Sequence, residues 1–333
     1  MKNQSIILVV VLAAVGLILW RQHPSHTSAV TVNADADESI ARTNEPIDPL
    51  PRTVSLDERK VSLGEQLFNE TKLSHDNTVS CASCHALTKG GTDQLQRSIG
   101  INGQIGDINA PTVLNAAYNF KQFWDGRADT LEEQVNGPIA NPKEMASSWA
   151  EVIQKLNHSS NYINQFYALY QKSPDAESVR DAIAAYERSL ITPDSRFDLY
   201  LRGDEQAITT QEKHGYRVFK EYGCASCHQG VAVGGNLFEK FGVMNNEGRG
   251  SSKADLGRFN VTGLEKDKYV FKVPSLRNVE LTSPYFHDGS VATLEDAIRT
   301  MVKFQLGRSL SDSDVEDVAM FLRTLTGRPR TKQ

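Results

Sequence analysis

Cysteine is scarce in this sequence, which has four cysteines among 333 residues. All four belong to two Cys-x-x-Cys-His motifs, Cys81–His85 and Cys224–His228, so none is left for a disulfide or a separate thiol site. Blocks of lysine and arginine are also missing, and the formal net charge is -5. Because basic and acidic residues are interspersed, the sequence gives no indication of nucleic-acid binding.

Long apolar runs are missing from the body of the chain, and one occurs at its start. Ile6–Trp20 is apolar, with Lys2 before it and Arg21 after it. This run has the length of a signal-peptide core and is short for a membrane span, which needs roughly 17–25 residues. We therefore expect residues 1–22 to be a signal peptide or, if uncleaved, an N-terminal membrane anchor, followed by a flexible linker over residues 23–51. Either outcome would export the body of the protein to the periplasm, and an anchor would tether it to the cytoplasmic membrane.

The two Cys-x-x-Cys-His motifs are typical of covalent haem attachment. The thiols are spaced to bind the two vinyl groups of one haem, and the histidine supplies the proximal iron ligand. A zinc ribbon would have paired Cys-x-x-Cys motifs without a systematic histidine, and a redox dithiol would lie in a βαβ context. We therefore expect two haem c groups, bound by Cys81, Cys84 and His85, and by Cys224, Cys227 and His228.

The segments that precede the two motifs resemble each other. Residues 56–68 and 210–219 both begin with charged residues and continue with a glycine and an aliphatic–Phe pair. This repeat predicts a mainly α fold of two tandem cytochrome c-like domains, residues 52–195 and 196–333, each wrapped round one covalent haem. No series of strands is evident. Apolar residues recur at helical spacing in residues 176–190 and 311–325.

The second axial ligand of each iron decides what its haem does. A haem closed by His and Met transfers electrons, whereas an open iron can bind a substrate. Met301 precedes the last predicted helix, where a cytochrome c places its ligand Met, so we expect it to pair with His228. Met244 and Met320 are competitors, and Met320 falls within that helix. A packed core methionine is the alternative interpretation of Met301.

Six blocks of the sequence resemble the bacterial di-haem cytochrome c peroxidases, over about residues 52–327. They are Phe123–Ala128, Leu131–Gln134, Gly137–Ile139, Asn141–Met145, Phe271–Asn278 and Pro284–Ser290. The resemblance implies that the N-terminal domain is peroxidatic and that the C-terminal domain is the electron-transfer domain. It also implies hydrogen peroxide as substrate and a small cytochrome c or cupredoxin as electron donor. Homodimers are common in the family.

The resemblance also implies roles for individual residues. Glu144 matches the carboxylate that shuttles protons while the peroxide O–O bond breaks. Gln134 matches the amide that positions peroxide, and Trp124 matches the aromatic bridge between the haems. Without the family pattern, all three would be read as ordinary surface or core residues. His287 is given no catalytic role.

A calcium site between the domains is implied in the same way. Asn109, Thr282 and Pro284 match the residues that hold this ion in the family. Amide and carbonyl oxygens suit a hard cation that keeps several waters. We therefore expect Ca²⁺ as a further cofactor.

The sequence departs from the family in the loop after the first motif. Many members have the pattern Ser-Ile-Gly-His there, and its histidine caps the peroxidatic iron at rest. Residues 98–103 read Ser-Ile-Gly-Ile-Asn-Gly, and the Ile101 side chain cannot bind iron. Neither His75 nor His158 is assigned as a replacement. We hypothesise that the first haem rests five-coordinate or water-bound and reacts without reductive activation.

Three functions compete on these observations. The first is peroxide reduction. The second is oxidative maturation of a protein cofactor, as in the relative that completes the tryptophylquinone of methylamine dehydrogenase. That relative has Tyr at its C-terminal haem, so Met301 argues against this function. The third is a non-catalytic di-haem electron carrier, which would need both irons closed, and a sixth ligand is found for one iron alone.

Overall fold

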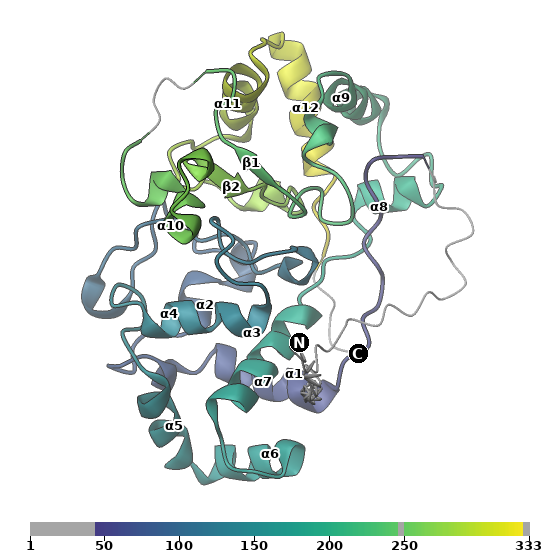
Figure 1. Cartoon of the computed structure of the whole chain (residues 1–333). Helices are drawn as coiled ribbons and strands as arrows, with labels where there is room; N and C mark the ends of the chain where they lie inside the picture. The colour runs from purple at the N-terminus through teal and green to yellow at the C-terminus, as the bar shows by residue number, and fades with distance from the viewer. Residues whose placement is uncertain (1–43, 246–249, 329–333) are drawn as a thin grey trace, which may run out of the picture. The chain divides into compact units, whose positions relative to one another are not determined.

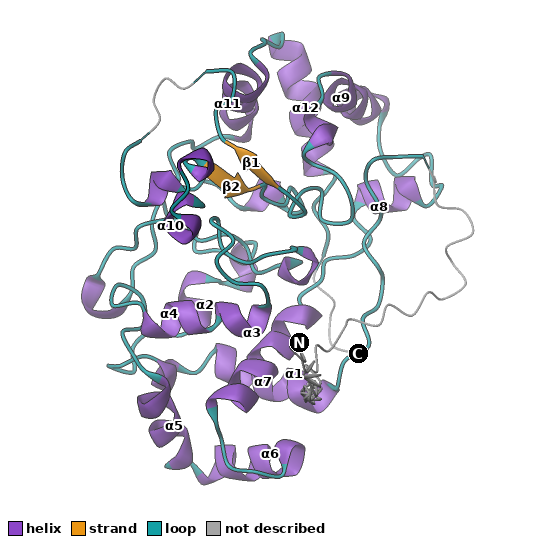
Figure 2. Ribbon diagram, in the orientation of Figure 1, coloured by secondary structure: helices purple, strands orange, loops and turns teal. Residues whose placement is uncertain are grey.

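The computed structural model describes residues 44–245 and 250–328, and the predicted export segment lies outside them. The fold is mainly helical, as predicted, with helices that differ widely in length (Figures 1 and 2). Within the described residues, no helix combines the length and the hydropathy needed to cross a membrane.

Helices α1 (Glu58–Phe68) and α7 (Ala176–Ser189) form the centre of the first half of the body. They pack closely because Gly64 lies at their crossing, where an added Cβ would come within 1.9 Å of the Ala182 carbonyl oxygen. The range of helix α7 confirms the helix that was predicted over residues 176–190. Helices α5 (Trp149–Asn157) and α6 (Ser160–Tyr170) add further apolar faces to the same core.

The second half repeats this arrangement with helices α9 (Thr210–Glu221) and α12 (Asp312–Arg323). Gly215 lies at their crossing, and its added Cβ would come within 1.9 Å of the Asp317 carbonyl oxygen. The glycine of the sequence repeat is therefore the residue that lets each helix pair approach. Helix α12 confirms the helix predicted over residues 311–325, and the Ser311 side chain caps its first turn.

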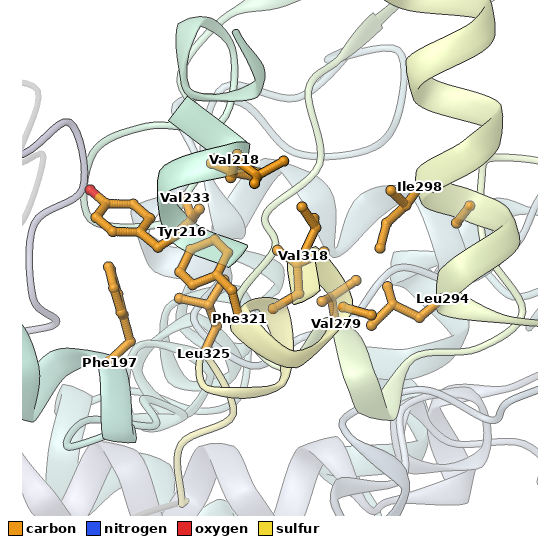
Figure 3. Close-up of a cluster of buried hydrophobic side chains, with 14 of the residues drawn as sticks. Phe197, Tyr216, Val218, Val233, Val279, Leu294, Ile298, Val318, Phe321 and Leu325 are labelled. Carbon is orange, nitrogen blue, oxygen red and sulfur yellow. The ribbon is translucent and has the colours of Figure 1, made fainter. Parts of the chain in front are cut away.

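The core of the second half is rich in aromatic rings. Phe197, Tyr216 and Phe321 pack edge-on or tilted, with ring centroids 4.7–5.0 Å apart, and Figure 3 shows them grouped beside Leu325. Aromatic pairs in these arrangements add to the stability that burial of their area gives. Helix α11 (Leu294–Leu306) contributes Leu294 and Ile298 to the same core, labelled in Figure 3.

One small sheet accompanies the helices in the described residues. Strands β1 (Phe238–Lys240) and β2 (Val270–Lys272) pair antiparallel, with Phe238 opposite Lys272 and Glu239 opposite Phe271. This pair was not predicted, because each strand has three residues, too few for a period of two to stand out.

The other helices are short. The α-helices are α2 (Cys81–Cys84), α3 (Leu131–Gln134), α4 (Asn136–Ala140), α8 (Arg196–Leu201) and α10 (Phe259–Thr262). The 3-10 helices are η2 (Thr71–Leu73), η3 (Leu87–Lys89), η4 (Ile101–Gly103), η5 (Ala116–Tyr118), η6 (Cys224–Ser226), η7 (Ala254–Leu256), η8 (Glu265–Asp267) and η9 (Val279–Leu281).

The end of the predicted linker is part of the folded body. Ile47 and Leu50 are fully buried, and Ile47 belongs to the core of the second half. The backbone N–H of Gly230 donates to the Pro46 carbonyl at 2.8 Å. The prediction of a flexible linker over residues 23–51 is therefore wrong for residues 46–50, which pack on the loop after the second motif.

Candidate functional site

The first Cys-x-x-Cys-His motif forms helix α2 and the residue that follows it. Ser80 and Ser83 exchange capping hydrogen bonds at its start. The Nδ1 atom of His85 lies 3.2 Å from the Gly91 carbonyl, and burial lowers the pKa of His85. A neutral imidazole that donates from Nδ1 leaves Nε2 as the ligand atom, so His85 fits the proximal side of a haem iron.

A cavity of about 50 Å³ lies beside this motif. Gln134, at the end of α3, and Glu144, in the turn after α4, line it together with His85. Most of the remaining lining is apolar: Leu73, Val79, Val135, Pro138, Ile139, Met145 and Ile183. The structure thus brings the two predicted polar residues of the first site to the motif that they were expected to serve.

Glu144 is held by its own turn. The Asn141 amide donates to its carboxylate at 2.6 Å. Burial raises the pKa of Glu144, and the hydrogen bond from Asn141 opposes part of that rise. A carboxyl group with a raised pKa holds a proton more readily than an ordinary glutamate does, which suits a group that accepts and returns a proton.

Ile101 lies against the same turn. Its side chain is buried, and its backbone N–H donates to the Glu144 carbonyl at 2.9 Å. The preceding Gly100 leaves so little room that an added Cβ would come within 2.1 Å of the Lys143 carbonyl oxygen. The loop that carries a capping histidine in many relatives is therefore fixed beside Glu144 by backbone contacts.

Glu187 on α7 was not predicted and also lines the first cavity. Its carboxyl group is buried, and its Oε2 has no hydrogen-bond partner in the part of the chain that the structure describes. Burial raises the pKa of Glu187 to about 8. The sequence held one signal: Glu187 falls four residues after Ile183, on the apolar face of a helix.

The second Cys-x-x-Cys-His motif begins with η6 and faces a larger cavity. His228 Nδ1 lies 3.3 Å from the Val233 carbonyl, and burial lowers the pKa of His228 to about 4. The cavity has a volume of about 250 Å³ and includes Met301 of α11 in its lining. Paired thiols, a neutral imidazole and a thioether around an apolar space fit a haem closed by His and Met.

The competing methionines do not line this cavity. Met244 is 62% exposed, and the Met320 sulfur lies 3.5 Å from an Arg323 guanidinium nitrogen. Among these three methionines, Met301 alone shares a cavity with His228.

Trp124 lines the second cavity and is fixed on several sides. Its indole N–H donates to the Asn109 carbonyl at 3.0 Å, and its carbonyl accepts from the Lys272 backbone N–H at 2.8 Å. Its ring meets those of Phe271 and His287 edge-on, with centroids 6.5 and 6.4 Å away. The indole is therefore held rigidly at the wall of the cavity.

The residues predicted to bind calcium also belong to the lining of this cavity. Asn109, Thr282 and Pro284 all line it. The Asn109 amide donates to the Leu95 carbonyl at 2.9 Å, which orients its side-chain oxygen. The donor set contains neutral oxygens, which suits a hard cation with retained waters.

Three further histidines, His75, His158 and His287, make other contacts. His287 stacks on Phe271 at 4.4 Å, and its Nε2 lies 2.9 Å from an Asp255 carboxylate oxygen. His75 lies at 3.0 Å from Glu151, and His158 Nδ1 lies 2.7 Å from the Gln154 carbonyl. Neither His75 nor His158 lines either cavity, as expected.

Comparisons with known proteins agree with this arrangement. A sequence profile described as "Di-haem cytochrome c peroxidase" matches residues 58–206. The chain is 49% identical over 296 residues to the cytochrome c peroxidase Ccp of Escherichia coli, covering 88% of this chain and 64% of that protein. It is 46% identical over 294 residues to the cytochrome c551 peroxidase of Nitrosomonas europaea, covering 88% and 87%.

A solved structure gives the same picture. The crystal structure of a MauG-like protein associated with microbial copper homeostasis superposes with a TM-score of 0.73 at 29% identity. The match covers 86% of this chain and 94% of that one. The fold is therefore shared along nearly the whole length of that protein.

Proposed function

The chain belongs to the di-haem cytochrome c peroxidase family, and on that basis we propose that it reduces hydrogen peroxide to water with electrons from a small cytochrome c or cupredoxin. The resemblance inferred from the sequence and the tandem cytochrome c-like fold are both confirmed. The observation that carries the proposal is the difference between the two cavities. Glu144 and Gln134 share one with His85, whereas Met301 shares the other with His228.

At the first site, the haem iron held by His85 supplies the redox chemistry that breaks the O–O bond. The residues of the chain supply a proton acceptor, an amide that orients the substrate and a mostly apolar lining that excludes water. Glu144 accepts the proton of the oxygen that approaches the iron and returns it to the oxygen that leaves as water. Gln134 offers an N–H donor and a carbonyl acceptor, which together fix the direction of a small polar substrate.

At the second site, His228 and Met301 would hold the haem iron between two ligands, and a Met ligand would raise the reduction potential of that haem, which suits it to store an electron. We assign Trp124 as the electron relay between the haems, because its indole lies at the wall of the second cavity and is fixed by hydrogen bonds at both its ring and its backbone. Two electrons and two protons then convert one peroxide into two waters.

The first haem should be ready to react at rest. Ile101 offers no ligand atom, and its loop is bonded to the turn that carries Glu144. Resonance Raman or electron paramagnetic resonance spectra of the protein as isolated should show one high-spin haem and one low-spin haem. Two low-spin haems, with a lag removed only by prereduction, would contradict this part of the proposal.

The remaining assignments complete the proposal. Residues 52–195 form the peroxidatic domain and residues 196–333 the electron-transfer domain. Residues 1–22 export the chain to the periplasm, as a signal peptide or a retained anchor, and the enzyme would assemble as a homodimer if it follows what is common in the family. Ca²⁺ binds at the second cavity through Asn109, Thr282 and Pro284.

A steady-state assay tests the function. Holoprotein, a reduced small cytochrome c and hydrogen peroxide are mixed, and oxidation of the cytochrome is followed by its absorbance. Turnover should depend on peroxide and fall strongly in Glu144→Gln, while Glu177→Gln, on the exposed start of α7, should match the unaltered protein. A carrier or a maturation enzyme would show no such turnover.

A further inference from the structure

Lys272 is a buried cation in the wall of the second cavity. It ends strand β2, its residue is 7% exposed, and it lines the space that His228 and Met301 face. Burial lowers the pKa of Lys272 to about 8. Among the hydrogen bonds and ion pairs formed within residues 44–245 and 250–328, none involves its ammonium group.

A buried ammonium group without a partner destabilises the folded protein, because it loses its hydrating water and forms no hydrogen bond or ion pair instead. The carboxylate nearest in the sheet does not supply that partner. Glu239 pairs with Phe271, whereas Lys272 pairs with Phe238, so Glu239 and Lys272 extend from opposite faces of the ribbon. The Glu239 carboxylate accepts from the Lys240 backbone N–H at 2.7 Å. Glu239 and Lys272 thus both line the cavity without pairing with each other, and an anionic group of the molecule bound there would supply the partner that the Lys272 ammonium group lacks.

We propose that Lys272 binds a propionate carboxylate of the haem attached at Cys224 and Cys227, and so positions that haem against Trp124. This inference rests on haem attachment at the second motif, which is part of the proposed function. The backbone of Lys272 supports it, because the same residue donates its N–H to the Trp124 carbonyl at 2.8 Å. One residue then links the electron store to the proposed relay.

The link has a measurable electrostatic consequence. A cation beside the haem stabilises the reduced state over the oxidised state, since reduction lowers the positive charge of the iron. Removing the cation should shift the reduction equilibrium of the second haem at least tenfold toward the oxidised form. A tenfold change in a one-electron equilibrium corresponds to about 59 mV.

Redox titration of the full holoprotein tests the assignment, with both haems followed by their spectra. Lys272→Met should lower the midpoint potential of the Met-ligated haem by about 59 mV or more. Lys272→Arg should lower it less, and Lys266→Met, on the exposed η8, should leave it unchanged. The first haem should keep its potential in all three variants. Equal shifts of both haems in Lys272→Met, or a shift no larger than that of Lys266→Met, would overturn the assignment.

A crystal structure of the unaltered holoprotein provides a second test that needs no variant to fold. The Lys272 nitrogen should lie within about 3.2 Å of a propionate oxygen of the second haem. A nitrogen bonded to any other group would overturn the assignment. Both tests are independent of the proposed activity, because neither uses peroxide or an electron donor. A protein without peroxidase turnover could still pass them.

Discussion

Removal of the Arg277 guanidinium should destabilise the second half of the body more than any surface change. This side chain is fully buried and donates to the Asp198 carboxylate at 2.7 Å. It also donates to the Val231 carbonyl in the loop after the second motif and to the Asp48 carbonyl, both at 2.8 Å. Asp198 in turn accepts from the Leu50 backbone N–H at 3.1 Å. One ion pair therefore joins the N-terminal segment, α8 and the haem-binding loop.

The size of the loss follows from what Arg277→Met leaves behind. Asp198 would keep a buried negative charge with backbone N–H partners but no cation, and breaking a buried pair in this way costs about 3–5 kcal/mol. The Val231 and Asp48 carbonyls, which accept partly buried hydrogen bonds, would lose a donor as well, at about 0.5–1.5 kcal/mol each. Since the free energy of unfolding of a whole domain is only about 5–15 kcal/mol, the variant should keep only a small part of its stability.

Urea unfolding of the holoprotein, followed by circular dichroism, measures this loss. Arg299→Ala is the matched control, because Arg299 pairs with Asp312 at the surface, where their side chains are 46% and 92% exposed. The control should show no measurable change. Adding Asp198→Asn to Arg277→Met should recover part of the loss, since the buried charge is then gone. An Arg277→Met protein as stable as the control, or a double variant whose loss is the sum of the two single losses, would refute the reasoning.

Four further predictions concern the two cavities. Glu144→Gln should slow the reaction with peroxide by about 10²–10⁴-fold in rapid-mixing experiments, because the proton acceptor is lost; an unchanged rate would remove Glu144 from the chemistry. Asn141→Leu deletes the hydrogen bond that favours the Glu144 carboxylate, so the acid limb of the pH–rate profile should move to higher pH, and a limb that stays in place would contradict this. Between the ordinary pKa of a glutamate and about 8, folded protein holds a proton on Glu187 that unfolded protein releases; stability to urea should therefore fall as pH rises through this window, and Glu187→Gln should abolish the fall. Met301→His should lower the midpoint potential of the second haem in a redox titration, and an unaltered potential would mean that Met301 is not its ligand.

The sequence predicted those features that repeat or follow a period. Both helices with regular apolar spacing were found within one or two residues of their ends. The repeated glycines Gly64 and Gly215 were visible as a pattern, but their reason, the close crossing of two helices, needed the structure. The packing of Ile47 and Leu50 was not predicted, because isolated apolar residues among Asp, Asn and Pro show no hydrophobic periodicity.

The site residues divide in the same way. Gln134 and Glu144 could be placed because they lie in blocks of sequence that resemble a known family, and the structure brings both to His85. Glu187 and Lys272 lie in a helix and a strand whose own patterns do not show what faces them. A buried charge is recognised only when its surroundings are known, since the same residue on a surface would need no explanation.

The two cavities lie beside two copies of the same repeat, yet their linings carry different polar groups. The first has two carboxyl groups, Glu144 and Glu187, both with raised pKa values. The second has a thioether, Met301, and a buried ammonium group, Lys272. A cation and a thioether ligand would favour the reduced state of the second haem, whereas the carboxyl groups would serve the first haem by transferring protons. The second haem should therefore take up the donor electron first and hold it, while the first stays oxidised until peroxide arrives. The direction of electron flow would then follow from Met301 and Lys272 rather than from the haems themselves, which are chemically the same.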